Sequence, residues 1–290
     1  MPSLSVVIPT HCRAGILSQC LDCLARQTVA GDIEVIVVSD GHDADTVALI
    51  TKAHTSALPF PLRFFEQEKS QQGAARNLGV KHATGRYVLF IGDDAFLKPH
   101  ACERHLVHLA RQPQCVLGFT TWDPALTITP VMRWLEKSGW QFAYPMLRDY
   151  EYAQIPPSMQ SRFTYAIHIS MPTDIAQKHP FREGIALYGW EDIEWGASLA
   201  QAGIPLFYAP DAVALHHHVL TLDASLARMK TLGQSAVQME AENPSLSLTP
   251  KGMKKFAYRL SSLLPTMAGM HRRAFLEGID RHKPFTYTMQ

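Results

Sequence analysis

The chain has 290 residues, of which 47% are hydrophobic and 18% are charged, as expected for a globular protein with a substantial core. A formal net charge of +1 argues against the strongly basic surface of a nucleic-acid-binding domain, so we expect no nucleic-acid partner. No apolar run approaches the roughly 20 residues that span a bilayer, and we expect no signal peptide. The odd number of cysteines, five, favours reduced thiols and a cytoplasmic location.

Apolar runs and helical patterns alternate along the first hundred residues. This alternation has the spacing of right-handed βαβ units, so it predicts a parallel, Rossmann-like α/β sheet. No G-x-G-x-x-G follows the first strand, which argues against a dinucleotide-binding site there. We expect strands at residues 4–10, 34–41, 62–65 and 87–91, and helices at residues 14–27, 46–54 and 74–83.

The pattern is weaker from about residue 116 onward. A strand is expected at residues 163–170, and an acid-rich segment at 188–196 opens a helix that ends near Ala202. A short strand follows at residues 205–208, and Val213 to Leu215 lead into the run His216-His217-His218. The last seventy or so residues alternate helical segments with polar breaks.

The expected strand at residues 87–91 runs through Gly92 directly into two carboxylates, Asp93 and Asp94. Adjacent anions repel each other unless a cation or a hydrogen-bonded partner lies between them. Open α/β sheets bind ligands at the carboxyl ends of their strands, and oxygen ligands favour Mg²⁺ or Mn²⁺. The sequence therefore indicates a divalent-cation site, and the alternative is a solvated Asp-Asp turn that caps the next helix.

Five motifs, taken in order, resemble those of the family 2 glycosyltransferases, which are inverting enzymes of the GT-A fold with nucleotide-sugar donors. The motifs are VVIPTHCR at residues 6–13, VVSDG at 37–41, GAARNLG at 73–79, GRYVLFIGDD at 85–94 and GWED at 189–192, with the histidines at 216–218 after them. The resemblance implies a GT-A catalytic domain at residues 1–218, with a nucleotide-sugar half at about 1–115 and an acceptor half at about 116–218. A helical C-terminal extension would occupy residues 219–290.

The resemblance also implies the activity and its partners. The chain would be a metal-dependent inverting glycosyltransferase that uses a nucleotide-diphosphate sugar, most simply a UDP-sugar. Its acceptor would be a hydroxyl group of a sugar, of a lipid-linked molecule or of a small molecule. Two other hypotheses are a nucleotidyltransferase, although Pro9 to Arg13 is no glycine-rich phosphate loop, and a nucleotide-sugar-binding protein without turnover.

The resemblance places the donor at the ends of the first two strands. Asp40 corresponds to the family residue that accepts a hydrogen bond from the base or the ribose, although an Asx turn before Gly41 would also explain an acid there. Pro9, Thr10 and Arg13 would line the same nucleotide-sugar pocket. Arg76 resembles the family arginine near the base and phosphates, and a surface ion pair is its structural alternative.

The metal ligands implied by the resemblance are Asp94 and His216. The usual pattern has acids at the positions of Gly92 and Asp94, and this chain departs from it at Gly92. Asp93 then contacts the ribose or acts through a water molecule, and it is the alternative metal ligand. Alternate residues of an extended strand face the same way, so His218 shares the side of His216 and is its alternative.

Residues Trp190, Glu191 and Asp192 resemble the acceptor-side motif of the family. Inverting transfer requires one base that takes the proton from the attacking hydroxyl, and we assign this role to Asp192. Glu191 would orient the acceptor, and Trp190 offers a flat apolar face on which a sugar or an aromatic acceptor can stack. The alternative is a helix N-terminus at which the helix dipole favours acids.

Basic and apolar residues alternate at helical spacing in the segment 251–264 of the expected extension. The basic residues are Lys251, Lys254, Lys255 and Arg259, and the apolar ones are Met253, Phe256, Leu260 and Leu264. Such a helix can make peripheral contact with an anionic membrane at its inner face. Alternatively, it packs on the catalytic domain and leaves a solvated basic face. The oligomeric state is not predicted by these patterns.

Overall fold

The computed structural model describes residues 2–55, 57–184 and 189–281 of the chain. Its described strands form a single mixed sheet in the order β3-β2-β1-β4-β8-β6-β9-β5, with β7 paired to β9. The strands are β1 (Leu4–Thr10), β2 (Ile33–Asp40), β3 (Leu62–Gln67), β4 (Tyr87–Ile91), β5 (Ala95–Leu97), β6 (Cys115–Trp122), β7 (Gln154–Ile155), β8 (His168–Pro172) and β9 (Leu206–His216).

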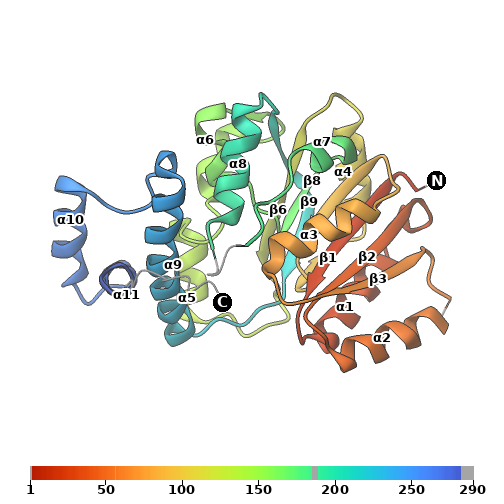
Figure 1. Cartoon of the computed structure of the whole chain (residues 1–290), viewed down its shortest axis with the longest axis horizontal. Helices are drawn as coiled ribbons and strands as arrows, with labels where there is room; N and C mark the ends of the chain where they lie inside the picture. Colours follow the sequence, from red (N-terminus) through yellow and green to blue (C-terminus); the bar gives the residue numbers. More distant parts are fainter. Residues whose placement is uncertain (1, 56, 185–188, 282–290) are drawn as a thin grey trace, which may run out of the picture.

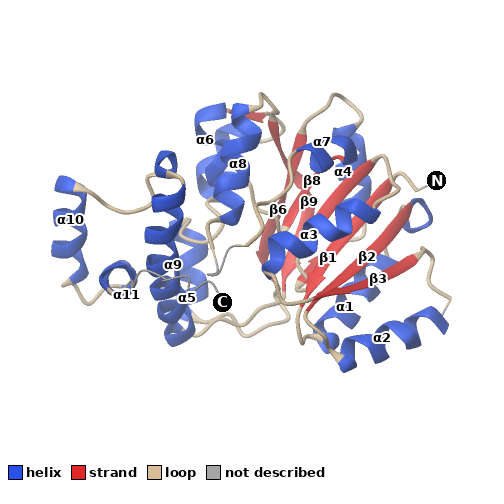
Figure 2. Cartoon of the chain, viewed as in Figure 1, coloured by secondary structure: helices blue, strands red, loops and turns tan. Residues whose placement is uncertain are grey.

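Helices flank this sheet and continue beyond it at the C-terminal end (Figure 2). They are α1 (Ala14–Ala25), α2 (Ala44–Thr55), α3 (Gln71–His82), α4 (Ala101–Leu109), α5 (Pro130–Ser138), α6 (Pro157–Phe163), α7 (Thr173–Lys178), α8 (Glu191–Gln201), α9 (Leu222–Glu242), α10 (Gly252–Ser262) and α11 (Met267–Asp280). Short 3-10 helices cover Ala30–Asp32, Tyr144–Tyr150 and Pro244–Leu246.

The N-terminal half of the sheet confirms the expected parallel arrangement. Strands β3, β2, β1 and β4 pair in parallel, and every residue of β1, β2 and β4 is buried. Alternate residues of β1 pack on opposite faces: Val6 joins the cluster that contains Leu17 of α1, and Val7 joins the cluster that contains Val80 of α3. Both faces of these strands are apolar because helices cover both, as in α/β proteins generally.

The second half of the sheet brings antiparallel strands next to the parallel ones. Strand β8 runs antiparallel to both β4 and β6, and β9 runs parallel to β6 but antiparallel to β5. The two runs expected at 205–208 and 213–215 form a single strand, β9. The residues between these runs are accommodated by a shift in the register of β6 against β9, which falls between Gly118 and Phe119.

The strand expected at residues 163–170 is wrong in its position. Residues Pro157–Phe163 form helix α6, and the strand begins only at His168. Proline at the first helical position lacks a backbone N–H that would be unpaired there anyway, and its fixed φ angle suits a helix start. The apolar run alone did not separate the end of this helix from the beginning of the strand.

The C-terminal helices lie to one side of the sheet, with α9 nearest to it and α10 at the end farthest from β1, β2 and β3 (Figure 1). Within the described ranges, no helix is both long and apolar enough to span a membrane. The boundary expected between residues 218 and 219 stays a prediction, and residues 282–290 of the expected extension lie outside the described residues.

Candidate functional site

The two carboxylates after β4 lie at the carboxyl end of the parallel strands and are almost fully buried. Arg13, which follows β1, bridges them: its Nη1 lies 2.9 Å from Oδ1 of Asp93 and its Nη2 donates to Oδ2 of Asp94 at 2.8 Å. Thr10 donates a hydrogen bond of 2.8 Å to Oδ2 of Asp93. The parallel pairing of β1 with β4 therefore places residues separated by more than eighty positions in one ion cluster.

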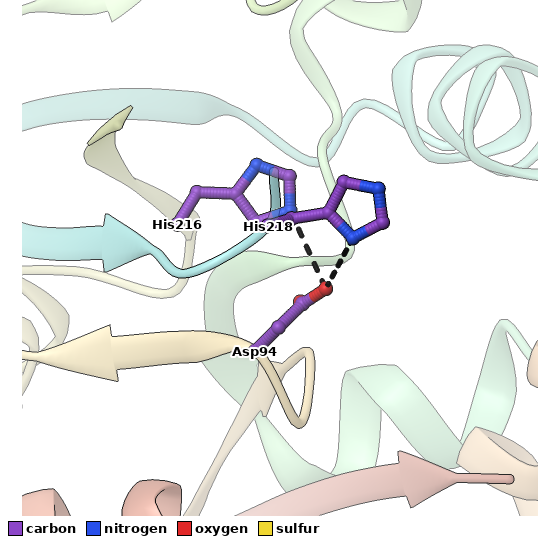
Figure 3. A group of neighbouring side chains, drawn as sticks. All are labelled: Asp94, His216 and His218. Carbon is purple, nitrogen blue, oxygen red and sulfur yellow. Dashed lines mark ion pairs between the residues drawn. The ribbon is translucent and has the colours of Figure 1, made fainter. Parts of the chain in front are cut away.

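Asp94 also faces two of the three consecutive histidines (Figure 3). Its Oδ2 lies 3.5 Å from Nε2 of His216 and 3.7 Å from Nδ1 of His218, and the carboxylate points toward both rings. One ligand atom from each residue lies within 4.8 Å of the other two. A carboxylate and two imidazoles at these separations are a donor set that suits a divalent first-row cation.

Strand pairing explains why these histidines reach Asp94. In the antiparallel pair of β5 with β9, His216 lies opposite Ala95, and the backbone N–H of His217 donates to the carbonyl of Asp94 at 2.8 Å. The ring of His216 stacks between Trp122 and the ring of His218, at centroid distances of 5.1 and 5.5 Å. His217 points away and bonds Asp123 at 2.7 Å, so the expected alternation of the three side chains is confirmed.

The two acids differ in their ionisation. Burial acts to raise the pKa of both, but the hydrogen bond and charge of His216, together with Arg13, hold the pKa of Asp94 well below its ordinary value. Burial raises the pKa of Asp93 to about 6, against the charge of Arg13, and the neighbouring charge of Asp94 adds to the rise. Asp94 therefore stays ionised to lower pH than Asp93, and an ionised carboxylate is the form that can bind a metal ion.

The departure from the usual acidic pattern at Gly92 has a steric explanation. A Cβ atom placed on Gly92 would lie 2.9 Å from Oδ1 of Asp94 and 3.1 Å from Ile167. An acidic side chain at this position would require the Asp94 carboxylate or Ile167 to move. The cluster next to Asp94 contains His218 in addition to His216.

The second acidic group lies at the N-terminus of α8. Gly189 and Trp190 both have left-handed backbone conformations, with φ angles of +105° and +72°, and the indole Nε1 of Trp190 donates to the carbonyl of Leu232 in α9 at 2.9 Å. A Cβ on Gly189 would collide with Leu232. A non-glycine residue with positive φ is uncommon, and such residues are frequently found at functional sites. The backbone conformation of this turn therefore marks it as a candidate part of the site.

Asp192 is the second residue of α8. One of its carboxylate oxygens is held by a hydrogen bond and the other has none from the described residues. Its Oδ2 accepts a hydrogen bond of 3.0 Å from the backbone N–H of Ala166. Its Oδ1 is shielded from solvent and has no hydrogen-bond partner in the described part of the chain. Burial raises the pKa of Asp192 to about 6; the charge of Arg76 opposes this rise and that of Glu191 adds to it.

Arg76 lies beside Asp192. Its side chain is 3% exposed, and its Nη1 lies 4.0 Å from Oδ1 of Asp192. Nη2 donates to Gln72, whereas Nε and Nη1 have no hydrogen-bond partner among residues 2–55, 57–184 and 189–281. The role expected for Arg76 at the base and phosphates stays a prediction, and the structure adds that its guanidinium lies beside the Asp192 carboxylate.

Both acidic groups line one cavity of about 880 Å³. This volume lies in the range of small-molecule binding sites. Ten of the residues expected in the site line this cavity: Pro9, Arg13, Arg76, Asp93, Asp94, Trp190, Glu191, Asp192, His216 and His218. Two others, Thr10 and Asp40, are not among the described residues that line it. Asp40 is buried instead beneath the loop before α3, where it accepts hydrogen bonds from the side chain of Gln67 and the backbone N–H groups of Ser70 and Gln71.

The cavity contains further cations that the sequence motifs did not identify. They are Arg162 of α6, Arg228 of α9, Lys254 of α10 and Arg272 of α11. The charge of Arg228 acts on both Asp192 and His218, lowering the pKa of Asp192 and contributing to the lowered pKa of His218, whose main cause is burial. No motif marks Arg228, because its place in the cavity depends on how α9 packs against the sheet.

The sequence was compared with protein families and with curated proteins. The model of the family "Glycosyl transferase family 2" matches residues 5–165. The chain is 26% identical over 224 residues to validoxylamine A glucosyltransferase of Streptomyces hygroscopicus subsp. jinggangensis, covering 71% of this chain and 53% of that protein. It is 38% identical over 95 residues to a PGL/p-HBAD biosynthesis glycosyltransferase of Mycobacterium bovis, covering 32% of this chain and 36% of that protein. The chain thus spans about half the length of the glucosyltransferase relatives it matches.

Solved structures with the same architecture were also found. The mannosyltransferase PcManGT from Pyrobaculum calidifontis, solved in complex with GDP-Man and Mn²⁺, matches with a TM-score of 0.61 and 17% identity, over 95% of this chain and 74% of that one. Residues 1–349 of TarS from S. aureus, in complex with UDP-GlcNAc, match with a TM-score of 0.59 and 15% identity, over 96% of this chain and 82% of that one. At these identities the likeness establishes the fold alone.

Proposed function

The chain belongs to glycosyl transferase family 2 and has its GT-A fold, and on this premise we propose that it transfers a sugar from a nucleotide-diphosphate sugar to a hydroxyl acceptor. The observation that carries the proposal is the joining of two groups in one cavity: the cluster of Asp94, His216 and His218, and the partly unpaired carboxylate of Asp192. The structural neighbours were solved with GDP-Man and with UDP-GlcNAc, which supports a nucleotide-sugar donor, and we propose a UDP-sugar.

We propose that Asp94, His216 and His218 hold a divalent cation, Mn²⁺ or Mg²⁺, with Asp93 as the alternative to one histidine. The donor set fits such an ion because Asp94 is held ionised and both rings present a nitrogen toward it. A cation bound there would neutralise the charge that develops on the leaving diphosphate. The presence of Mn²⁺ in the PcManGT complex supports this part of the proposal.

On the donor side, the chain's own residues bind and orient the nucleotide. Pro9 and Arg13 border the cavity at the carboxyl end of β1, and Thr10 fixes Asp93 through its hydrogen bond. We assign to Asp93 a hydrogen bond from the ribose. We assign Asp40 and Arg76 to the base and phosphates, with Asp40 acting through the loop that it holds together.

On the acceptor side, Asp192 is the proposed general base. The attacking hydroxyl donates its proton to Oδ1 of Asp192 while its oxygen bonds to the anomeric carbon, and the nucleotide diphosphate leaves from the opposite face. This single displacement inverts the anomeric configuration. A pKa of about 6 keeps the carboxylate ionised at neutral pH and close in basicity to the working pH, as general-base catalysis requires. Glu191 and Trp190 line the cavity on the same side and would orient the acceptor.

The acceptor is a hydroxyl group of a sugar, of a lipid-linked molecule or of a small molecule, and we place the reaction in the cytoplasm or at the inner face of a membrane. The free state of all five cysteines is compatible with this location.

The experiment that tests the function is a panel of nucleotide sugars, screened by thermal shift with and without Mn²⁺ and then by nucleotide release. We expect one donor to stabilise the protein only with the cation and to release its nucleotide diphosphate. Asp94→Asn should remove this response, and the matched control is Asp174→Asn, because Asp174 is 66% exposed and pairs with Lys178 outside the cavity. If no donor binds, or binding is equal in EDTA, the proposal is wrong.

A further inference from the structure

The outward face of helix α10 is apolar. Side chains of α10 and of the turn after it form an exposed stripe: Met253 is 90% exposed, Phe256 71%, Leu260 61%, Leu263 71% and Leu264 53%. A helix on the surface of a globular protein normally turns such a stripe toward the core. Here α10 lies at the extremity of the molecule (Figure 1), and the stripe is exposed to solvent instead. We call these five residues the outer stripe.

Polar contacts hold α10 in this orientation. Ser262 is buried against α11, and its carbonyl accepts hydrogen bonds from Nε and Nη2 of Arg273 at 3.1 and 2.8 Å. The guanidinium of Arg272 lies 5.3 Å from the centre of the Tyr258 ring. Because Tyr258 and Ser262 occupy the inner face, the helix cannot rotate its outer stripe inward without losing these contacts. The exposure is therefore a property of how α10 packs.

The segment that carries the outer stripe is positively charged, and basic residues flank the stripe. Residues 251–281 contain seven lysines and arginines and two acidic residues, whereas the whole chain has a net charge of only +1. With about 3.6 residues per helical turn, Lys254 and Arg259 lie on opposite flanks of the stripe. Long basic side chains can extend from the flank of an apolar face toward phosphate groups. Lys251 pairs with Glu240 of α9 and is turned toward the protein.

We propose that α10 docks the protein on an anionic phospholipid surface, with the outer stripe in the boundary between headgroups and acyl chains. Both the apolar area and the basic flanks of the helix fit this partner, since interfacial helices bind through buried apolar surface and attraction to anionic lipids. A second copy of the chain is disfavoured as the occupant, because pairing two α10 helices would bring two strongly positive segments together.

The same helix borders the cavity. Lys254 and Tyr258 line it together with Asp94 and Asp192, so a docked α10 brings the cavity close to the lipid headgroups. From this closeness we infer that the acceptor is a hydroxyl group carried by a membrane lipid. This inference about the acceptor rests on the proposed transfer function, whereas the docking of α10 does not.

The test is co-sedimentation of the full chain with vesicles of phosphatidylcholine alone or mixed with phosphatidylglycerol. We expect binding to the anionic vesicles that weakens with salt, and little binding to the neutral ones. The double variant Phe256→Glu with Leu260→Glu should lose binding. Arg259→Gln, which removes one flanking charge, should weaken it about fivefold. Val107→Glu, a change at a 43% exposed residue of α4, is the matched control and should bind normally.

Two further measurements separate the possible outcomes. Donor binding and nucleotide release without lipid should be unchanged in the Phe256→Glu, Leu260→Glu variant, so a failure of docking is distinguishable from a failure of the transfer function. Unchanged vesicle binding by this variant overturns the proposal. A concentration-dependent dimer in light scattering that the variant abolishes would also overturn it. This result would assign the stripe to a second copy.

Discussion

The Asp94 end and the Asp192 end of the cavity differ in how their charges are balanced. At the Asp94 end, the carboxylates contact Thr10, Arg13 and His216 at 2.8 to 3.5 Å. At the other end, buried atoms of Asp192 and Arg76 have no hydrogen-bond partner among the described residues. A buried polar atom left unpaired costs about 1–3 kcal/mol. The first end is thus prearranged, whereas the second keeps bonding capacity that a substrate can use.

The change with the largest expected effect is Asp94→Asn, which removes the charge on which the balanced end depends. We expect the cation-dependent stabilisation by nucleoside diphosphate to disappear, since the variant loses the anionic member of the Asp94, His216 and His218 cluster. At a ligand concentration of about 100 times Kd, the stabilisation lost is about 2.7 kcal/mol. Thermal unfolding with Mn²⁺ and with EDTA measures it. If Asp94→Asn keeps the normal response to the cation and Asp93→Asn loses it, the roles assigned to the two acids are reversed.

Asp192→Asn tests the unbalanced end. The amide keeps the shape and the hydrogen bond from Ala166 but cannot take a proton, so transfer should fall about 10²–10⁴-fold. Nucleotide affinity should scarcely change, because the residue faces the acceptor. Steady-state transfer rates and calorimetry on the same preparation measure the two effects. Glu191→Gln should weaken apparent acceptor affinity with a smaller loss of rate. Near-normal turnover in Asp192→Asn, or product with retained anomeric configuration, would contradict the mechanism.

Asp40 extends the comparison to a third acid, which is buried and fully hydrogen-bonded outside the cavity. Asp40→Ala leaves the backbone N–H groups of Ser70 and Gln71 without their acceptor. We expect nucleotide affinity to fall by about 1–3 kcal/mol, the cost of truncating a hydrogen bond to a charged group. Calorimetry on folded variant measures it. A lower melting temperature with unchanged affinity would show that Asp40 only holds the loop.

Local patterns predicted the N-terminal half of this protein well. Strands β1, β2 and β4 are largely apolar runs, and the polar residues that the motifs assign to the site lie at or just after their carboxyl ends. The shared side of His216 and His218 followed from strand periodicity alone. Each of these features is determined by residues within one segment of the chain. The parallel pairing of neighbouring strands then brings the segments together.

Features that depend on distant segments were not predictable in the same way. The proximity of Arg76 to Asp192 depends on α3 meeting the start of α8, and the place of Arg228 depends on the packing of α9. The apolar and basic residues of α10 were identified, but periodicity does not tell which face of a helix turns inward. That orientation is decided by Arg272 and Arg273 of α11, and it exposes the outer stripe.

The smallest expected effect is a shift of the pH profile, and it tests the balance of charges around Asp192 directly. The base must be ionised, so transfer should be constant above the pKa of Asp192, about 6, and should fall tenfold per pH unit below it. Glu191 raises this pKa and Arg76 lowers it. Removing the negative neighbour favours ionisation, so Glu191→Gln should move the acid limb to lower pH. Removing the positive neighbour disfavours ionisation, so Arg76→Gln should move the limb to higher pH.

The measurement is the pH dependence of kcat/KM for the acceptor at saturating donor and Mn²⁺. Protonation of His216 or His218 would also reduce activity at low pH, and nucleotide-diphosphate binding measured over the same range isolates that contribution. We expect the pH at which binding declines to be the same in both variants, because neither change touches the Asp94 cluster, although Arg76→Gln should lower the affinity at every pH. Opposite displacements of the transfer profile identify Asp192 as the titrating group. An acid limb at the same pH in the native protein and in both variants would mean that the proton is taken by another residue, and that the unpaired oxygen of Asp192 is not the base.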